Sequence, residues 1–378
     1  MMYKSHERAL EALTRRGRRR ALAAASGIDF SSNDYLGLAR SPELREAARS
    51  AIAREVSIGS GGSRLLRGND REHEAIEAEA AAFFGAERAL FFGGGFLANV
   101  ALFSTLPQRG DLVVYDSLIH ASVHDGMRLG KAEQAAARHN DAQSFEDAIK
   151  AWRNAGGTGT PWLAVESLYS MDGDRAPLDE LIAIADRYDG VLMIDEAHAT
   201  GVLGPMGRGL GSALEGRENV VALHTCGKAL GAMGALVTGP RILCDYLVNR
   251  SRPFIYATAP SPLVTAIMRA ALLICRFDAA RREKLASLVV FAGQRLSETC
   301  GLKPSGTHIQ PVIVGSDERA MCLAAAMQKR GFDIRAVRPP TVPEGTARLR
   351  VMLTLNVDEA QVAAMAEALG EELKGLGP

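Results

Sequence analysis

The sequence carries no net charge, because 44 Lys and Arg residues balance 44 Asp and Glu residues. This balance removes the general electrostatic attraction that brings proteins to nucleic acids or anionic membranes. The sequence also has no uninterrupted apolar run of about 18 residues, so we expect no membrane-spanning helix. With 47% hydrophobic and 23% charged residues, the chain has an ordinary globular composition. A disordered chain is therefore excluded.

Cysteine is also scarce, with five residues in 378. An odd, scattered set is neither a disulfide framework nor a C-x-x-C metal site, and we expect no metal. We expect every cysteine except Cys226 to be a buried small hydrophobic residue. The N-terminal segment lacks the apolar core of a secretory signal, although it is rich in arginine. We therefore expect a cytoplasmic protein.

Apolar runs alternate with helical patterns along most of the chain. Helices are expected at 1–22, 42–52, 72–84 and 178–188. Strands are expected at 88–92, 111–116, 162–167, 191–195 and 220–225. Strands that alternate with helices of this length favour right-handed crossovers. The predicted fold class is therefore α/β, with a mostly parallel, doubly wound sheet.

The pattern changes from about residue 261, where a long helical region runs to 299. Shorter elements follow, with strands expected at 309–314, 333–337 and 348–355 and helices at 318–330 and 358–373. That order is typical of a smaller α+β domain. We expect an N-terminal helix or arm at 1–32, a large domain at 33–262 and a small domain at 263–378.

Lys228 lies in a turn of small residues just after an apolar strand. Glycine, alanine and cysteine surround it, so its amine should be partly desolvated. Desolvation favours the neutral amine, which is the form that attacks an aldehyde. Taken alone, an ordinary lysine at a strand end is the better interpretation.

Asp195 ends a continuous apolar strand, and His198 follows three residues later. Ligands of open α/β sheets bind at the carboxyl ends of the strands. Asp195 could pair with a protonated ring nitrogen there, and His198 could bond a ring oxygen. A helix N-cap is the plainer role for Asp195. A metal site of Asp195, Glu196 and His198 lacks further ligands at sensible spacing.

A triple glycine at 93–95 follows the first expected strand of the sheet. Such glycines let backbone N–H groups close on a phosphate at a helix N-terminus, although a tight turn is the simpler role. Neither a nucleotide-binding P-loop nor a dinucleotide fingerprint fits the spacing. His120 directly follows another strand end, where its ring could stack on a flat cofactor.

Together these signals place a phosphate cradle, a stacking ring, an aspartate and a lysine at strand ends, in the chain order of pyridoxal phosphate (PLP) enzymes. The segments SSNDYLG (31–37), GSGGSR (59–64) and SMDGD (170–174) resemble those of the α-oxoamine synthases. So do IDEAHATGVLG (194–204), TCGKALG (225–231) and RPPTVPEGTARLR (338–350). The resemblance covers about 30–355. It implies the aspartate-aminotransferase-like fold, with PLP in the large domain.

Members of this family join an amino acid to an acyl thioester with loss of CO2. The resemblance implies that Lys228 holds PLP as a Schiff base and later removes the α-proton of the amino acid. It implies that His120 stacks on the pyridine ring and also meets the substrate. Asp195 would then pair with the ring nitrogen and His198 with the phenolic oxygen. Further implied contacts with the cofactor come from Gly95, Phe96, Ser170 and Thr225.

The substrate contacts implied by the family are spread more widely. Arg350 would hold the amino-acid carboxylate, a task suited to a bidentate guanidinium. Arg338 and Thr341 would lie at the acyl mouth, and Asn33 near the reacting centre. Arg20 would match the N-terminal substrate arginine of the family. Here the chain departs from the pattern, because the segment 22–30 is shorter than the hairpin usual in the family.

Cys226 is a second departure, since the family commonly has an aromatic residue there. The resemblance also implies a homodimer, with the Gly/Ser loop 58–68 reaching across the subunits. The acyl donor could be carried by CoA or by acyl carrier protein. Three other functions stay open. The chain could be a related synthase that uses glycine or serine, a PLP aminotransferase or lyase, or a non-catalytic protein that binds acyl thioesters.

Overall fold

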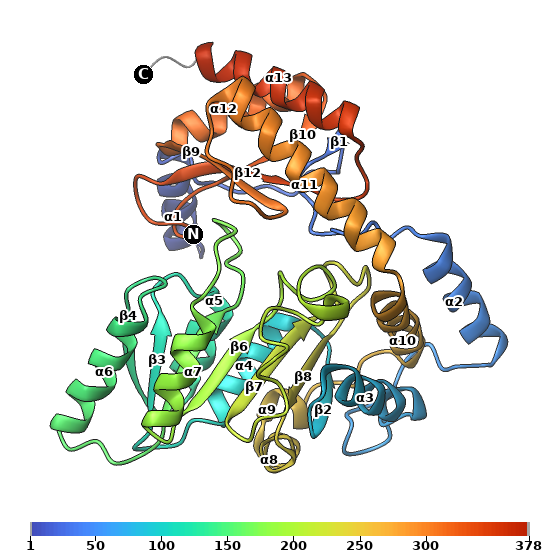
Figure 1. Cartoon of the computed structure of the whole chain (residues 1–378), viewed down its shortest axis with the longest axis vertical. Coiled ribbons are helices and arrows are strands. Elements are labelled where there is room, and N and C mark those ends of the chain that lie inside the picture. Colours follow the sequence, from blue (N-terminus) through green and yellow to red (C-terminus); the bar gives the residue numbers. More distant parts are fainter. Residues whose placement is uncertain (1, 376–378) are drawn as a thin grey trace. The chain divides into compact units, whose positions relative to one another are not determined.

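The computed structural model describes residues 2–375 and divides into two compact units (Figure 1). The larger unit comprises 33–170 and 174–283, and the smaller unit comprises 2–32, 171–173 and 284–375. The expected division differs at two places. Segment 263–283 belongs to the larger unit, because helix α10 (Pro262–Phe277) packs against α2 (Pro42–Ala53) and α3 (Arg71–Phe84). The N-terminal segment is part of the smaller unit rather than a separate arm.

One sheet organises the larger unit. Its strands lie in the order β2 (Arg88–Phe92), β8 (Ala235–Gly239), β7 (Val220–Thr225), β6 (Val191–Asp195), β5 (Pro161–Glu166), β3 (Leu112–Asp116) and β4 (Glu133–Ala137). Strand β8 is antiparallel to both neighbours and every other pair is parallel, which confirms the mostly parallel sheet. Strands β4 and β8 were not among the expected strands.

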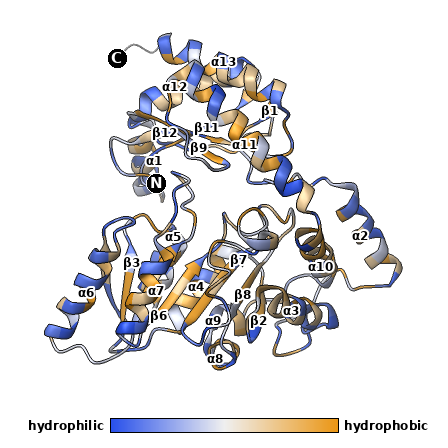
Figure 2. Cartoon of the chain, viewed as in Figure 1, coloured by the Kyte–Doolittle hydropathy of each residue, from blue (hydrophilic) through white to orange (hydrophobic). Residues whose placement is uncertain are grey.

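Helices cover both faces of this sheet. Successive side chains of a strand point to opposite faces, so an apolar strand needs a helical layer on each side. Val113 packs with α4 (Gly95–Thr105) and α5 (Ala121–Leu129) in one hydrophobic core. Its neighbours Leu112 and Val114 pack in a second core. That core contains α6 (Ala142–Asn154) and α7 (Leu178–Arg187). Figure 2 shows the strands mostly in the hydrophobic colour and the outer helices in mixed colours.

Two short helices, α8 (Arg241–Arg250) and α9 (Arg252–Ile255), complete the larger unit. The long helical region expected from 261 to 299 is interrupted. Asp278 ends α10, and its carboxylate accepts a hydrogen bond from the backbone N–H of Arg281, 3.0 Å away, in the first turn of α11 (Ala279–Cys300). A polar residue that satisfies the orphan N–H groups of the next helix explains the break.

The smaller unit contains an antiparallel sheet in the order β11 (Arg335–Val337), β12 (Ala347–Met352) and β9 (Ile309–Gly315). Helices α12 (Asp317–Lys329) and α13 (Glu359–Gly375) pack with α11 in its core. The short strand β1 (Ile28–Asp29) pairs in parallel with β10 (Phe332–Asp333). No helix within 2–375 combines the length and apolar character that crossing a membrane requires.

The N-terminal helix is shorter than expected. Helix α1 spans Lys4–Arg15, and Gly17 follows with a φ of 64°. A glycine in this left-handed conformation terminates a helix, which corrects the expected bounds of 1–22. Arg18 then pairs with Asp317 at 2.5 Å and Glu344 at 2.7 Å instead of continuing a solvated helical face.

The cysteines also differ from expectation. Cys226 is buried, as are Cys244 and Cys275, whereas Cys300 is half-buried and Cys322 is exposed. The expectation was therefore wrong for Cys322. It is correct for Cys244 and Cys275, which pack as small hydrophobic residues in the interior.

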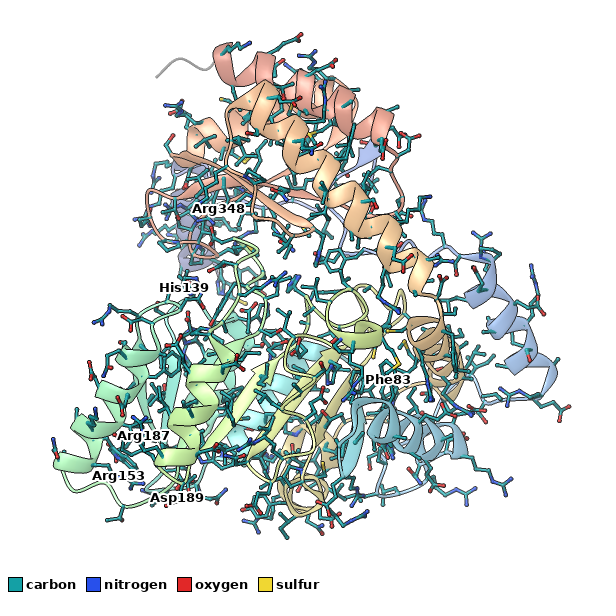
Figure 3. All side chains as sticks on the ribbon, viewed as in Figure 1. Phe83, His139, Arg153, Arg187, Asp189 and Arg348 are labelled. Carbon is teal, nitrogen blue, oxygen red and sulfur yellow. The ribbon has the colours of Figure 1, made fainter. Side chains whose placement is uncertain are left out.

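An ion-pair network joins the loops at the carboxyl ends of β3 and β5. His139, labelled in Figure 3, lies just beyond β4. Its Nδ1 is 2.8 Å from a carboxylate oxygen of Asp116, and its Nε2 is 2.6 Å from one of Asp174. Asp116 also accepts backbone hydrogen bonds from Leu118 and Asn140, each at 2.8 Å. The imidazole therefore bridges two carboxylates as a double donor.

This bridge favours the charged imidazolium. Burial lowers the pKa of His139, but hydrogen bonds to Asp116 and Asp174 outweigh it and raise the pKa to about 10. The unfolded value is 6.5. Because the folded pKa is the higher one, the stabilisation is complete below pH 6.5 and is lost as the pH rises towards 10.

Replacing His139 should therefore flatten the alkaline stability profile. We expect His139→Gln to unfold more readily than the wild type at pH 6 and to approach it by about pH 10, since Gln does not titrate. Denaturant unfolding at pH 6, 8 and 10 measures this difference. Parallel profiles for the two proteins would show that the imidazolium does not stabilise the loops.

Helices α4 and α5 approach closely at Gly126. A Cβ added there would lie 2.8 Å from Phe103 Cβ and 3.0 Å from the carbonyl oxygen of Asn99. Alanine normally favours a helix by about 1 kcal/mol over glycine. We nevertheless expect Gly126→Ala to destabilise the protein by about 1–3 kcal/mol through overpacking.

Gly375→Ala is the matched control, because Gly375 is exposed at the end of α13 and an added Cβ there has no neighbour within 4 Å. Its free energy of unfolding should change by less than about 0.5 kcal/mol, as for most surface substitutions. Urea unfolding of both variants gives the comparison. An unchanged or raised stability of Gly126→Ala would contradict the close approach.

Candidate active site

A cavity of about 320 Å³ lies in the larger unit, at the carboxyl ends of the parallel strands. Ligand sites of open α/β sheets occupy this edge. It brings together eight of the residues expected from the sequence, namely Asn33, Gly95, Phe96, His120, Asp195, His198, Thr225 and Lys228. The juxtaposition expected from the strand ends is therefore present.

A larger hollow of about 1090 Å³ lies elsewhere, lined among others by Gly190, Asn219 and Arg241. Gly190 and Asn219 directly precede β6 and β7, so this hollow faces the amino ends of the strands. It contains none of the expected residues. The smaller cavity is therefore the candidate active site.

The triple glycine forms one wall of the cavity. Gly93 and Gly94 leave open space where a Cβ would be, and Gly95 begins α4. A Cβ on Gly95 would lie 2.5 Å from Thr225 Cγ2, so only glycine permits this approach. The first N–H groups of α4 thus lie beside the Thr225 side chain, and a helix N-terminus with an adjacent hydroxyl binds anions.

Asp195 is a buried residue in the wall of the site. One carboxylate oxygen accepts a hydrogen bond from the Asn99 amide at 2.8 Å. The other accepts the backbone N–H of Ala197 at 2.9 Å. Asp195 is only 8% exposed, so its charge calls for a cationic partner in the cavity.

A hydrogen-bond chain links Asp195 to the ring of His120. The Asn99 amide also donates to Ser122 Oγ at 3.0 Å, and Ser122 Oγ lies 2.7 Å from His120 Nδ1. The backbone N–H of Ser122 also donates to that nitrogen at 3.3 Å. Because Nδ1 accepts, His120 is the neutral tautomer with its proton on Nε2.

Sequence reasoning did not identify Asn99 or Ser122. Asn99 lies one helical turn after Gly95, on the same face of α4, so helical spacing offered a signal. Ser122 follows the N-cap residue His120, a position that gives no comparable indication. Both side chains are buried, and they hold the aspartate and the histidine in fixed orientations.

The ring of His198 is held by a contact with Tyr35. The hydroxyl of the buried Tyr35 lies 2.5 Å from His198 Nδ1 and donates to Asn33 Oδ1 at 3.1 Å. This contact connects the SSNDYLG segment to the strand end that carries Asp195. Tyr35, a third residue not identified from the sequence, therefore orients the His198 ring in the wall of the cavity.

Lys228 projects from the tight loop between β7 and β8 and is half-buried. The loop closes through Gly231 N–H to Lys228 O and Cys226 N–H to Gly234 O, both at 2.9 Å. Gly231 has a φ of 68°, and a Cβ there would lie 2.5 Å from the backbone of Ala39. Burial raises the pKa of the neighbouring Cys226 thiol, so this cysteine is a packing residue.

Ser170 is not among the residues that line the cavity. Its backbone N–H donates to Glu166 Oε2 at 3.1 Å, and Glu166 itself lines the cavity. Glu166 ends β5 and is 2% exposed. Glu166 was not among the predicted site residues, because the strand was expected to run past it to residue 167 and only Asp195 was predicted as a carboxylate at a strand end.

The remaining expected residues, Arg20, Arg338, Thr341 and Arg350, belong to the smaller unit. Arg20 is exposed, whereas Arg338 donates to the carbonyl oxygen of Gly17. Arg350 lies on β12 opposite Arg335 and Pro311. Its neighbour Arg348, labelled in Figure 3, forms a buried ion pair with Asp172.

The arrangement suits one kind of ligand. It offers a backbone cradle for an anion, a carboxylate for a cation, a flat imidazole and a primary amine around one cavity. These groups fit a planar ring that carries a phosphate and a protonated nitrogen. Residues 2–375 contain no cluster of three or more His, Cys, Asp or Glu residues that could hold a metal ion.

Comparison with known proteins agrees with this chemistry. The family model of aminotransferase class I and II matches residues 25–369. The 8-amino-7-oxononanoate synthase of Chromobacterium violaceum is 44% identical over 91% of this chain and 88% of its own. That of Anaeromyxobacter dehalogenans is 41% identical over 98% of this chain and 95% of its own.

Solved structures give the same result. A serine palmitoyltransferase from S. paucimobilis with bound PLP has a TM-score of 0.89 and 25% identity, covering 99% of this chain and 98% of its own. An 8-amino-7-oxononanoate synthase from Francisella tularensis has a TM-score of 0.78 and 28% identity, covering 93% and 98%. The chain therefore belongs to the aminotransferase class I and II family, in its α-oxoamine synthase branch.

Proposed function

We propose that the chain condenses L-alanine with a pimeloyl thioester, releasing CO2 and the free thiol, to form 8-amino-7-oxononanoate for biotin synthesis. The observation that carries this proposal is the identity of 40–44% to 8-amino-7-oxononanoate synthases over most of the chain. The segments 338–350 and 309–311 also resemble this member of the family most. The cofactor is PLP.

The cavity fits PLP in two respects, an anion cradle and a buried carboxylate. The open space at Gly93 and Gly94, the close approach of Gly95 to Thr225 and the start of α4 form an anion cradle. The buried carboxylate of Asp195 calls for a cation in the cavity. When bound, PLP supplies an electron sink that stabilises negative charge at the α-carbon of the amino acid.

We assign the cofactor contacts to the cavity residues. The backbone of Gly95 and Phe96 and the hydroxyl of Thr225 would hold the phosphate. Asp195 would keep the ring nitrogen protonated, since Asn99 and Ala197 fix its carboxylate in place. The neutral ring of His120 would lie against the pyridine face.

His198 would bond the phenolic oxygen, with its ring held by Tyr35. Ser170 supports this part of the wall through its backbone bond to Glu166 rather than by lining the cavity. Lys228 Nζ would hold the cofactor covalently. Once the substrate amine replaces it, the freed amine would accept the α-proton, because desolvation keeps such an amine neutral.

The substrate contacts remain part of the proposal. Arg350 would hold the carboxylate of alanine, and Arg338 and Thr341 would contact the acyl chain. Asn33 lines the cavity and would lie near the reacting atoms. Arg20 is exposed, as is Arg19, whereas the nearby Arg18 is occupied by two carboxylates, so Arg20 is available to an anionic substrate.

We further propose that the enzyme is a cytoplasmic homodimer. The Gly/Ser loop presents exposed apolar side chains, with Ile58 at 78% and Leu66 at 80% exposure. Exposed apolar groups of this size on one loop favour burial against a second subunit. The acyl donor would be pimeloyl-CoA or pimeloyl acyl carrier protein.

Replacing the proposed lysine should separate cofactor chemistry from folding. We expect Lys228→Ala to lose the visible absorption of lysine-bound PLP after gel filtration. Thiol release should fall by at least about 10³-fold, within the range expected for loss of a general base. Lys131→Ala, an exposed lysine away from the cavity, is the control and should keep both properties. An unchanged spectrum in Lys228→Ala would refute the assignment.

The amino-acid substrate is tested directly by CoA release from pimeloyl-CoA with L-alanine, glycine or L-serine. We expect release and a product of the mass of 8-amino-7-oxononanoate with L-alanine alone. Release with glycine or serine instead would retain the cofactor chemistry and reject the substrate. A keto acid produced from the amino acid without CoA release would indicate an aminotransferase.

A further inference from the structure

Three neighbouring strands of the larger sheet end in a buried carboxyl group. Asp116 ends β3, Glu166 ends β5 and Asp195 ends β6. These strands are adjacent, and Glu166 pairs directly with Asp195 in the register. Like charges at neighbouring buried positions repel, so such a row needs either counter-ions or a proton.

Two members of the row have partners for a negative charge. Asp116 faces the imidazolium of His139 at 2.8 Å and accepts two backbone N–H groups. Asp195 accepts the Asn99 amide and the backbone N–H of Ala197. Under the proposed function, the protonated ring nitrogen of PLP would complete the surroundings of Asp195.

Glu166 has no such set of partners. Its Oε2 accepts one backbone N–H, from Ser170 at 3.1 Å. Its Oε1 is buried and has no hydrogen-bond partner within residues 2–375, although Glu166 lines the cavity. A buried polar oxygen that lacks a partner calls for an explanation, such as a ligand that has yet to enter.

The charges around Glu166 favour its neutral form. Burial raises its pKa to about 8, and the neighbouring charges of Asp195 and Asp116 act in the same direction. Lys228 is the charged group that opposes them. An anionic Glu166 would in turn hold Lys228 as an ammonium ion, which is the wrong form for a nucleophile or a base.

We propose that Glu166 is a positioning residue that remains protonated in the PLP-loaded enzyme and donates its carboxyl proton from Oε1 to an acceptor of the bound cofactor. This inference rests on the proposed function. Asp195 is then the charged carboxylate of the cavity and Glu166 the neutral donor beside it. The site keeps one negative charge for the ring nitrogen, and Lys228 can lose its proton.

The test uses the pH dependence of the visible absorption of the PLP-loaded enzyme, which follows protonation of the lysine-bound cofactor. Glu166→Gln keeps a neutral hydrogen-bond donor, so its spectral pKa should match the wild type. Glu166→Leu removes a hydrogen-bond donor that favours the deprotonated form of the lysine-bound cofactor. The spectral pKa of this variant should therefore rise. Glu180→Gln, an exposed glutamate on α7, is the matched control.

An anionic Glu166 predicts the opposite sign. Both Glu166→Gln and Glu166→Leu would then lower the spectral pKa, by about one unit or more for the loss of a close buried charge. That outcome, or identical values in all four proteins, would overturn the inference. A wild-type protein that binds no PLP would instead overturn the proposed function, so the two failures are distinguishable.

Infrared difference spectroscopy gives a second measurement that does not depend on turnover. The wild-type holoenzyme at pH 7 should show the carbonyl stretch of a protonated carboxylic acid that Glu166→Gln lacks. If Glu166→Gln does not bind PLP, Glu166→Asp replaces it and should shift that band. A carboxylic acid signal that neither substitution affects would contradict the assignment.

Discussion

The structure of the larger unit depends on keeping carboxylates buried at one edge of a sheet. Asp116, Glu166 and Asp195 end adjacent strands there, and each buried carboxyl group needs a counter-charge, a hydrogen-bond partner or a proton. The groups that satisfy them come from distant segments of the chain, since Asn99 lies on α4 and His139 follows β4. The loops around the cavity are therefore held by electrostatics as much as by apolar packing.

The sequence was sufficient for the features that depend on local pattern. Apolar runs at 111–116, 191–195 and 220–225 predicted buried parallel strands, because strands covered on both faces are apolar along their whole length. Residues at or just after the end of each of these strands then had to lie at the edge of the sheet where the parallel strands have their carboxyl ends. That rule alone brought His120, Asp195 and Lys228 to one cavity. The long family motifs added the cofactor to this geometry.

Features that depend on three-dimensional context could not be predicted in this way. Strand β4 contains Glu133–Ala137, which lacks β-branched residues and is a strand only because β3 pairs with it. Asn99 and Tyr35 serve the site through partners far away in the sequence. The end of α1 was missed because Gly17 was read as part of an amphipathic run rather than as a left-handed terminator.

The pairing of β1 with β10 has a consequence for the order of synthesis. Ile28 and Asp29 are synthesised before the larger unit, but their partners Phe332 and Asp333 follow only after the whole of that unit. Throughout that interval the N-terminal segment has no strand to pair with, and its contact is among the least local in the chain. The larger unit can complete its sheet first, whereas the smaller unit can fold only after the larger unit has been synthesised.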